Sequence, residues 1–548
     1  PCGGRPFPLS QRGHDVGEDL LVLLVKLADL AVFLEVHALP AVVVGGAASG
    51  GDAFGEVGGV LLVDVAVLAG LLLAVAHPGQ RGLEVHVELA TKTKIFCSCP
   101  TTFGAEPNTQ CCPVCTGMPG TLPVLNRQVV DYAVKAGLAT NCTIAKYSKE
   151  DRKNYFYPDL PKAYQISQYD LPLCEHGWLE IESDKGTKKI GITRIHIEED
   201  AGKLIHDDEH GTMIDCNRCG VPLIEIVSEP DIRSAEEAVA YVKKLRAIIM
   251  YTGISDCKMN EGSLRCDVNL SVHKKGEPFG TRTEMKNINS FTFIQKAIEY
   301  EYKRQVEAIE AGETIVQETR RYDSAANKTF SMRKKEDAND YRYFPDPDLP
   351  PIITSDEKIA ELQASIPQLP DSRKADYIEK YGLSAHDAEM LINQKPIADY
   401  FEAAARLTEY PKLLANMMIS ELFALLPPDS DEVKIPIDGA HMAAIATMSG
   451  EGTINSSTAK KLLRTIYEQD DDPVRIVKEQ NLAQISDPVI LQQYVDEAIA
   501  ADPKSVAAYK AGKTAAAKAI MGKIMAKTGG KGNPVKLDEL LMAALNKQ

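Results

Sequence analysis

The first 82 residues lack isoleucine, threonine, asparagine, methionine and tyrosine, and they contain a single lysine, Lys26. The rest of the chain uses all of these residue types freely. The longest apolar run of this segment, Val60 to Ala76, is interrupted by Asp64, and acidic residues stand where a signal peptide would be basic. We expect no membrane span and no signal peptide, and we interpret residues 1–81 as spurious upstream sequence, translated in a wrong frame or from a wrong start.

A net positive charge is also missing. The 548 residues include 61 Lys and Arg against 77 Asp and Glu, a formal net charge of -16. The molecule as a whole therefore repels nucleic acid, and such a partner must meet a local basic surface. Hydrophobic residues make up 44% and charged residues 25%, which excludes a disordered or fibrous protein.

Two catalytic signatures are absent from the sequence. The string nearest to a Walker phosphate loop, Ala511 to Thr514, lacks the glycine five positions before Gly512. The chain also has no Gly-Ser-Ser-rich amidase signature and no credible Cys–His pair for releasing ammonia from glutamine. If this chain transfers nitrogen, the ammonia must come from another chain.

The twelve cysteines are clustered, unlike those of a secreted disulfide framework. Such clusters in a large chain indicate metal ligands or reduced thiols, and a cytoplasmic location is the default. Two close pairs separated by twelve residues predict a structural zinc site, with the ligands Cys97, Cys99, Cys112 and Cys115. Cys216 and Cys219 form a rival pair, and Cys111 is an alternative to Cys112.

Three predicted strands carry carboxylates. Glu84, His86 and Glu88 alternate with apolar residues and therefore share one strand face. Acidic residues end the strand before Asp200, and Glu225 interrupts an apolar run. A buried carboxylate is costly unless it is paired or metal-bound, and oxygen-rich sites suit Mg²⁺. These patterns predict a magnesium site with the ligands Glu84, His86, Glu199 and Glu225, although a solvated strand face is the simpler alternative for the first segment.

The pattern of predicted strands and helices divides the rest of the chain into three parts. Residues 82–365 read as an α+β domain, residues 366–470 as an all-α helical domain, and residues 471–548 as an all-α tail. A hairpin is predicted from Leu264 to Met285, and a helix from the N-cap Ser290 to the stop at Gly312.

The tail is locally basic. Residues 503–548 contain nine Lys and two acidic residues. Glycines at 522, 529, 530 and 532 are expected to break the helices and let the backbone approach a phosphate-bearing partner, although a solvated helix face also explains a lysine run. The lysines singled out for this contact are Lys513, Lys518, Lys523, Lys527 and Lys531.

Six motifs carry a family resemblance: Gly82–Leu89, Asp151–Asp159, Lys162–Gln168, Glu198–Lys203, Pro222–Pro230 and Asp340–Pro345. Together they closely resemble the B subunit of aspartyl/glutamyl-tRNA amidotransferase, and the resemblance covers residues 82–548 with a cradle-shaped catalytic domain first. Where the family has a short strand leading into Gly82, this chain has His77 to Arg81.

The resemblance implies a ligase subunit that uses ATP to phosphorylate the side-chain carboxylate of Glu-tRNA(Gln) or Asp-tRNA(Asn), which ammonia then amidates. It implies three partners, namely a glutamine-hydrolysing amidase subunit, a small third subunit and the misacylated tRNA, with Mg²⁺ at the four predicted ligands. The residues expected to contact ATP phosphates or the tRNA acceptor end are Arg152, Lys153, Arg265, Lys286 and Arg342, with structural ion pairs as an equal alternative for each.

Two other hypotheses compete with the ligase. One is a non-catalytic, zinc-containing tRNA adapter, in which the carboxylates are structural. The other is an inactive product in which the unusual N-terminus disables the first strand. Substitution of Glu199 or Glu225 by Gln distinguishes the first two, because only a ligase would lose amidation while keeping tRNA binding.

Overall fold

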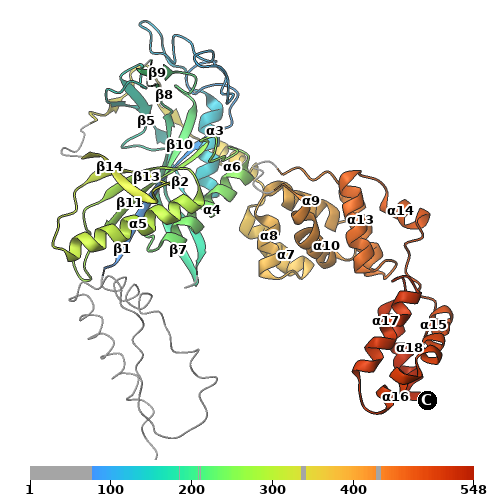
Figure 1. Ribbon diagram of the computed structural model, residues 1–548. Coiled ribbons are helices and arrows are strands. Elements are labelled where there is room, and N and C mark those ends of the chain that lie inside the picture. Colours follow the sequence, from blue (N-terminus) through green and yellow to red (C-terminus); the bar gives the residue numbers. More distant parts are fainter. Residues whose placement is uncertain are drawn as a thin grey trace, which may run out of the picture. The chain divides into compact units, whose positions relative to one another are not determined.

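The computed structural model describes residues 77–183, 186–207, 209, 211–334, 341–427 and 433–547 (Figure 1). Residues 1–76 lie outside the described residues, and most of the segment that we interpreted as spurious upstream sequence falls there. In the described ranges no helix combines the length and the apolar character that a membrane crossing needs. The described chain begins with a sheet-containing region and continues into helices, which confirms the predicted order of structural classes.

A nine-stranded sheet organises the first region, in the order β14-β13-β12-β11-β1-β10-β7-β6-β2. Its strands are β1 (Gly79–Glu88), β2 (Thr143–Ile144), β6 (Cys174–Ser183), β7 (Gly186–Glu199), β10 (Pro222–Ser228), β11 (Leu264–Val272), β12 (Thr283–Ile288), β13 (Glu318–Asp323) and β14 (Lys328–Lys334). Strand β1 begins at Gly79, three residues before the predicted boundary, so Gly79 to Arg81 belong to the first strand. The predicted hairpin is confirmed as β11 and β12.

One face of this sheet is apolar. Val85, Ile226, Ile195 and Cys174 are successive register partners on β1, β10, β7 and β6, and all four are essentially fully buried. The thiol of Cys174 lies 3.6 Å from the carbonyl oxygen of Ala133. Helix α3 (Arg127–Ala139) therefore packs on this face, and α4 (Ala235–Thr252) contacts both α3 and β6. Because side chains alternate along a strand, the polar residues of β1 lie on the opposite face.

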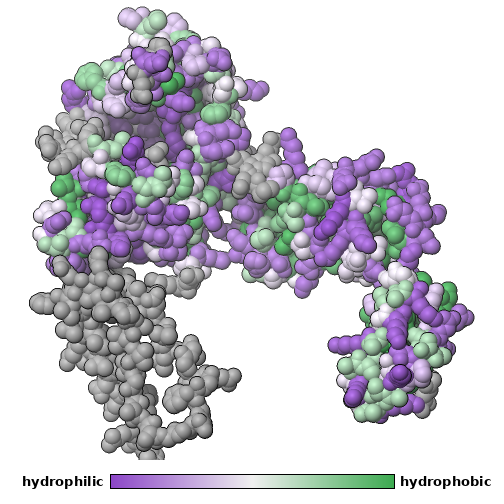
Figure 2. Space-filling model, viewed as in Figure 1, coloured by the Kyte–Doolittle hydropathy of each residue, from purple (hydrophilic) through white to green (hydrophobic). Residues whose placement is uncertain are grey.

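Three small sheets and one long helix complete this region. They are β15-β4-β5, with β15 (Phe344–Pro345), β4 (Asp151–Asn154) and β5 (Tyr164–Ser167); the pair β16 (Ile352–Ile353) and β3 (Tyr147–Ser148); and the pair β8 (Lys203–Asp207) and β9 (Gly211–Asp215). Helix α5 (Phe291–Glu310) follows Ser290, whose Oγ accepts the amide N–H of Phe293, as predicted for this cap. Figure 2 shows that hydrophilic residues predominate on the visible face of the sheet-containing region.

The chain divides into two compact units. The smaller one includes the described residues 77–79, Ser271–Thr281 and Tyr302–Ile315, and the larger one holds the remaining described residues. Within the smaller unit, Tyr302 donates its hydroxyl to the carbonyl of His77, and His77 Nε2 lies 2.6 Å from Glu310 Oε1. These bonds fix the chain as it enters β1.

Helices follow residue 355, and those from residue 370 onward form two apolar cores. The first core takes residues from Tyr377 to Val477, and the second takes residues from Leu491 to Leu545. The helices are α6 (Asp356–Ala364), α7 (Pro370–Tyr381), α8 (Ala385–Ile392), α9 (Lys395–Ala405), α10 (Pro411–Met417), the π-helix η1 (Met418–Leu422), α11 (Phe423–Leu425), α12 (Gly439–Gly450), α13 (Ser456–Glu468), α14 (Pro473–Glu479), α15 (Pro488–Ala501), α16 (Pro503–Lys510), α17 (Ala515–Lys527) and α18 (Pro534–Lys547).

Two details differ from the sequence-based expectations. Helix α14 contributes Ile476 and Val477 to the first core, although it lies beyond residue 471, where we placed the start of the tail. Gly522 does not break a helix, since it lies inside α17. The surrounding Ala and Lys residues of α17 are good helix formers and outweigh one glycine. Gly529 and Gly530, by contrast, follow the end of α17 with positive φ.

Candidate active site

His86, Glu198 and Glu225 meet on the polar face of the large sheet. His86 on β1 is the register partner of Glu225 on β10, and Glu225 is the partner of His196 on β7. One ligand atom from each of His86, Glu198 and Glu225 lies within 4.8 Å of the other two. His86 Nδ1 is 3.4 Å from Glu198 Oε1. These atoms are close enough for a single cation to contact all three.

The charges of this cluster depend on one another. Burial lowers the pKa of His86, but the hydrogen bond with Glu198 and the charges of Glu225 and Asp267 outweigh burial and raise this pKa to about 9. Burial would raise the pKa of Glu198, yet hydrogen bonds from His196 and His86 and the charge of Lys153 hold it well below its usual range. The cluster therefore retains ionised oxygen atoms in a largely buried position.

A second acidic cluster adjoins the first one. Ligand atoms of Glu84, Asp267 and Glu284 lie within 4.8 Å of one another. Asn269 donates to Glu84 Oε1 at 2.9 Å, and Lys286 Nζ lies 2.7 Å from Asp267 and 3.1 Å from Glu284. Burial raises the pKa of Glu84, and the charges of Glu225, Glu284 and Asp267 raise it further. The excess of negative charge and the all-oxygen donor set fit a hard divalent cation such as Mg²⁺.

Glu199 lies apart from both clusters, so the structure brings only part of the predicted ligand set together. Successive side chains of a strand point to opposite faces, so Glu198 faces the acidic cluster and Glu199 does not. The carboxylate of Glu199 pairs with Lys162 and accepts the amide N–H of Ile166 at 2.9 Å. It lines a cavity of about 220 Å³ together with Arg152 and Tyr164. Of the four predicted ligands, only His86 and Glu225 share a cluster, and Glu84 belongs to the neighbouring one.

The four predicted zinc ligands do come together. The sulfur atoms of Cys97, Cys99, Cys112 and Cys115 lie within 4.8 Å of one another. Cys112 Sγ and Cys115 Sγ are 3.9 Å apart, and tetrahedral Zn–S bonds require a separation of roughly 3.8 Å. The hydrogen bond from the Cys97 thiol, the Cys112 amide and the charge of Lys94 together lower the pKa of Cys115 to about 4 against the effect of burial. The donor set fits zinc.

The rival cysteines lie outside this group. Cys111 donates to the carbonyl of Asn108 at 3.3 Å, and Cys219 Sγ lies 3.9 Å from the carbonyl of Asp159. Among the described residues, neither Cys216 nor Cys219 belongs to a metal-sized cluster. The geometry therefore favours the two pairs selected from the sequence.

The five basic residues assigned to phosphate or acceptor-end contacts have different surroundings. Lys286 bonds the second acidic cluster, and Arg265 bonds Asp200 through two nitrogens at 3.3 and 2.6 Å. Lys153 acts electrostatically on Glu198 and Glu225 and lies 5.2 Å from the ring centre of Tyr341. Arg152 instead bonds Asp346 and Asp348. Arg342 has a φ of 47°, and its carbonyl accepts from Asn154.

The lysines of the tail fall into two groups. Lys523 pairs with Asp502, Lys527 pairs with Glu497, and Lys531 donates to a backbone carbonyl. Lys513 and Lys518 are exposed, and neither forms an ion pair within the described part of the chain. The second group presents uncompensated positive charge.

Two long stretches of the chain match family models. Residues 80–360 match the model described as the GatB/GatE catalytic domain, and residues 399–545 match the model described as the GatB domain. The chain belongs to the GatB family. The resemblance found in the motifs is thereby confirmed, and it covers both acidic clusters, the four cysteines and the tail lysines.

Proteins similar to this GatB-family chain are found in several bacteria. The relative from Caldicellulosiruptor saccharolyticus is 56% identical over 472 residues, which are 85% of this chain and 98% of that protein. Relatives from Carboxydothermus hydrogenoformans and Agathobacter rectalis are 54% and 53% identical, with the same coverage. All three are named as the B subunit of aspartyl/glutamyl-tRNA(Asn/Gln) amidotransferase.

Sequence reasoning missed three members of the acidic clusters in this GatB-family chain: Glu198, Asp267 and Glu284. A signal for Asp267 was present, because Arg265, Asp267 and Asn269 alternate with apolar residues along β11. The same alternation sets Glu284 and Lys286 on one side of β12. The same alternation was a local signal for Glu198 over Glu199, because His196 and Glu198 alternate with Ile195 and Ile197 along β7.

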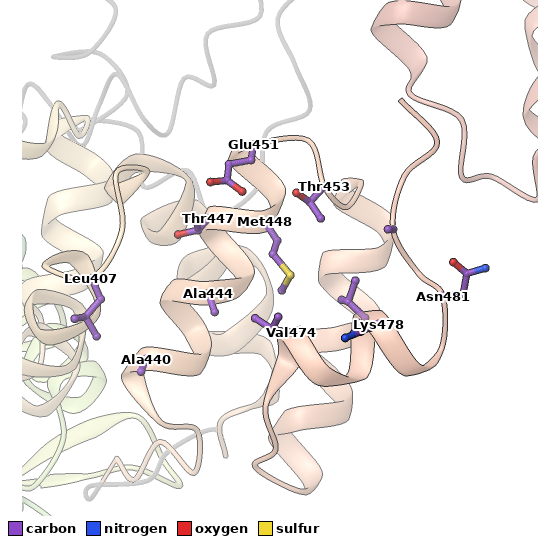
Figure 3. Close-up of a pocket in the computed structure, with 12 residues that line it drawn as sticks. Leu407, Ala440, Ala444, Thr447, Met448, Glu451, Thr453, Val474, Lys478 and Asn481 are labelled. Carbon is purple, nitrogen blue, oxygen red and sulfur yellow. The ribbon is translucent and has the colours of Figure 1, made fainter. Parts of the chain in front are cut away.

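A larger cavity, of about 820 Å³, lies in the helical region of the GatB-family chain (Figure 3). Ala444 and Met448 of α12 face Val474 of α14 across it, and Glu451 and Lys478 are the charged lining residues. Its lining is mainly apolar and brings no group of ionisable side chains together. The candidate active site is therefore the acidic sheet face.

Proposed function

We propose that this GatB-family chain is the activating subunit of a tRNA-dependent amidotransferase. It would use ATP to phosphorylate the side-chain carboxylate of Glu-tRNA(Gln) or Asp-tRNA(Asn), and ammonia would then displace the phosphate to give Gln-tRNA(Gln) or Asn-tRNA(Asn). The names of the relatives support the reaction class, a carbon–nitrogen ligase that uses glutamine as the nitrogen donor. The observation that carries the proposal is the paired acidic cluster among buried and half-buried basic residues.

The chemistry explains why such a site needs both signs of charge. A carboxylate is a poor electrophile until one oxygen becomes a leaving group. When bound, Mg²⁺ would neutralise the charge on the transferring phosphoryl group. His86, Glu198 and Glu225 would hold one ion, and Glu84, Asp267 and Glu284 offer a second position. Lys153 and Lys286 would orient phosphate oxygens from the same face.

The cysteine cluster would stabilise the fold, and the tail would bind tRNA. Zinc at the four cysteines would fix the loop before α3 without taking part in the reaction. Misacylated tRNA would meet the tail lysines, and a glutamine-hydrolysing amidase subunit, together with a small third subunit, would supply ammonia. Free thiols at the described cysteines suit a reducing cytoplasm.

The experiment compares Glu225→Gln with Glu180→Gln in the complete complex. Glu180 is an exposed glutamate on β6 of the same sheet and serves as the matched control. With misacylated tRNA, ATP, Mg²⁺ and glutamine, we expect Glu225→Gln to lose at least about 100-fold in amidation rate while tRNA binding is kept. The control should retain its activity.

The adapter hypothesis predicts a different outcome. If the carboxylates are only structural, Glu225→Gln lowers the thermal midpoint and weakens tRNA binding together with any activity. A folded Glu225→Gln variant with normal amidation would contradict the ligase proposal. The two charge clusters favour the ligase, because an adapter has no use for six clustered acidic and histidine side chains.

A further inference from the structure

Lys94 is a buried cation beside the four-cysteine cluster. Its exposed fraction is 0%, and it is among the largest fully buried side chains of the chain. Nζ lies 3.6 Å from Cys115 Sγ and 3.2 Å from the carbonyl oxygen of Cys216. Within the described part of the molecule, no carboxylate lies within ion-pair distance of this ammonium group. Sulfur is therefore its anionic partner.

The backbone around Lys94 fixes the position of the ammonium group. The amide N–H of Lys94 donates to the carbonyl of Cys99 at 2.9 Å, and the next amide, of Ile95, donates to the carbonyl of Gly220 at 2.9 Å. One bond joins the segment to the cysteine loop, and the other joins it to the turn before β10. The side chain then spans the same two elements. Lys94 thus links Cys115 to the Cys216–Gly220 turn.

The ammonium group of Lys94 compensates negative charge at the cysteine cluster. Four thiolates around a divalent ion leave two net negative charges, and this cluster is half-buried. A buried charge is costly unless an opposite charge or a hydrogen bond compensates it. Outer partners that hydrogen-bond to metal ligands commonly set metal affinity. The ammonium of Lys94 supplies both the opposite charge and the N–H donor.

We propose that Lys94 is a positioning residue for zinc at Cys97, Cys99, Cys112 and Cys115. It holds the Cys115 sulfur in place by donating a hydrogen bond to it, and it removes one unit of the excess negative charge. The inference rests on zinc being the metal of this cluster, and it is independent of the amidation reaction.

The test measures zinc retention and thiol protection in the full chain. Lys94→Met keeps the apolar stem and removes the charge and the donor. Lys92→Met is the matched control, because Lys92 is exposed two residues away. We expect Lys94→Met to bind zinc about 10- to 100-fold more weakly in chelator competition, as for the loss of other outer partners. Its cysteines should be alkylated faster by iodoacetamide, and Lys94→Arg should restore part of the affinity.

Folding is checked separately so that the result remains decisive. Lys94→Gln keeps a side-chain N–H donor and lacks the charge, and circular dichroism checks that it folds as the native chain does. Unchanged zinc affinity in folded Lys94→Met or Lys94→Gln would overturn the proposal. So would a native chain that binds no zinc. Neither readout uses amidation, so a failure of the Lys94 proposal can be distinguished from a failure of the proposed function.

Discussion

At the scale of single residues, Glu198 and Glu199 are neighbours in the chain with opposite surroundings. Glu198 lies between His86 and His196, and His196 also lies 3.7 Å from Glu225. Glu199 faces Lys162 and is neutralised by it. Glu198 therefore faces the acidic cluster, where a cation would contact it, whereas Glu199 is turned away from that cluster toward Lys162.

This contrast predicts different effects of two adjacent substitutions. Glu198→Gln should weaken Mn²⁺ binding, with Mn²⁺ as a spectroscopic probe for Mg²⁺, by about 10-fold or more, because a ligand is lost. Glu199→Gln should change it by less than about 3-fold. Electron paramagnetic resonance titration of each variant measures both constants. Equal losses would mean that the ion contacts both carboxylates.

The sequence predicts the residues of this site better than their grouping. Alternation along β1 correctly set Glu84 and His86 on one face, because strand geometry is local. Which strand neighbours β1 is not local, since Asp267 on β11 approaches Glu84 only through sheet order. The choice between Glu198 and Glu199 is local again, because His196 and Glu198 share the face opposite Ile195 and Ile197, a signal that our prediction did not use.

At the scale of elements, close packing limits what a strand tolerates. A Cβ at Gly177 of β6 would lie 2.8 Å from the backbone carbonyl of Thr140 and 2.3 Å from the Cys142 sulfur. That carbonyl accepts the N–H of Trp178 and cannot move freely. Gly177→Ala should therefore lower the free energy of unfolding by about 1–3 kcal/mol in denaturant titration.

Gly522 of α17 is the contrasting position. A Cβ there would meet nothing within 4 Å, and its φ is not positive. Gly522→Ala should raise the stability of the tail by about 0.5–1 kcal/mol, since alanine loses less backbone entropy in a helix. A stabilised Gly177→Ala or a destabilised Gly522→Ala would contradict this account of packing.

A pH-dependent contact joins α12 to the end of α13. His441 Nδ1 lies 2.7 Å from Asp470 Oδ1, and this hydrogen bond raises the pKa of His441 above 6.5, with Asp438 and Asp472 contributing further. A raised pKa in the folded state means that the contribution is complete below the unfolded value and is lost as the pH rises through the folded value.

The thermal midpoint of the helical region should therefore fall as the pH rises from below the ordinary histidine pKa of about 6.5 to alkaline pH. His441→Gln should remove this part of the pH dependence and leave the midpoint at the alkaline end nearly unchanged. Scanning calorimetry at several pH values measures both effects. If His441→Gln and the native chain show the same pH profile, the pH dependence of the thermal midpoint arises from other groups.

At the scale of the whole molecule, charge is distributed unevenly. The net charge is -16, yet the tail holds nine Lys against two acidic residues after Pro503. Exposed ion pairs such as Lys523 with Asp502 contribute little stability and leave those lysines exchangeable. Lys513 and Lys518 have no such partner among the described residues, so their positive charge is not compensated by a neighbouring carboxylate there.

Binding of tRNA should therefore depend on salt through the tail. The double variant Lys513→Ala and Lys518→Ala should lower the slope of log affinity against log salt by about 2, one for each phosphate contact. Lys412→Ala, an exposed lysine on α10 outside the tail, is the control. Filter binding at several salt concentrations tests this, and an unchanged slope would exclude these lysines from the interface.

The position of β1 in the large sheet has a consequence for synthesis. Leu83 of β1 donates its amide to Ser228, a residue 145 positions later, and β11 lies further still along the chain. At about 5–20 residues per second, the first strand leaves the ribosome roughly 10–30 s before its neighbours exist. During that interval the apolar side of β1 lacks the strands that flank it in the finished sheet. The second acidic cluster comes into being only after β12 is translated, so a divalent ion bound there would report that β1, β11 and β12 have joined.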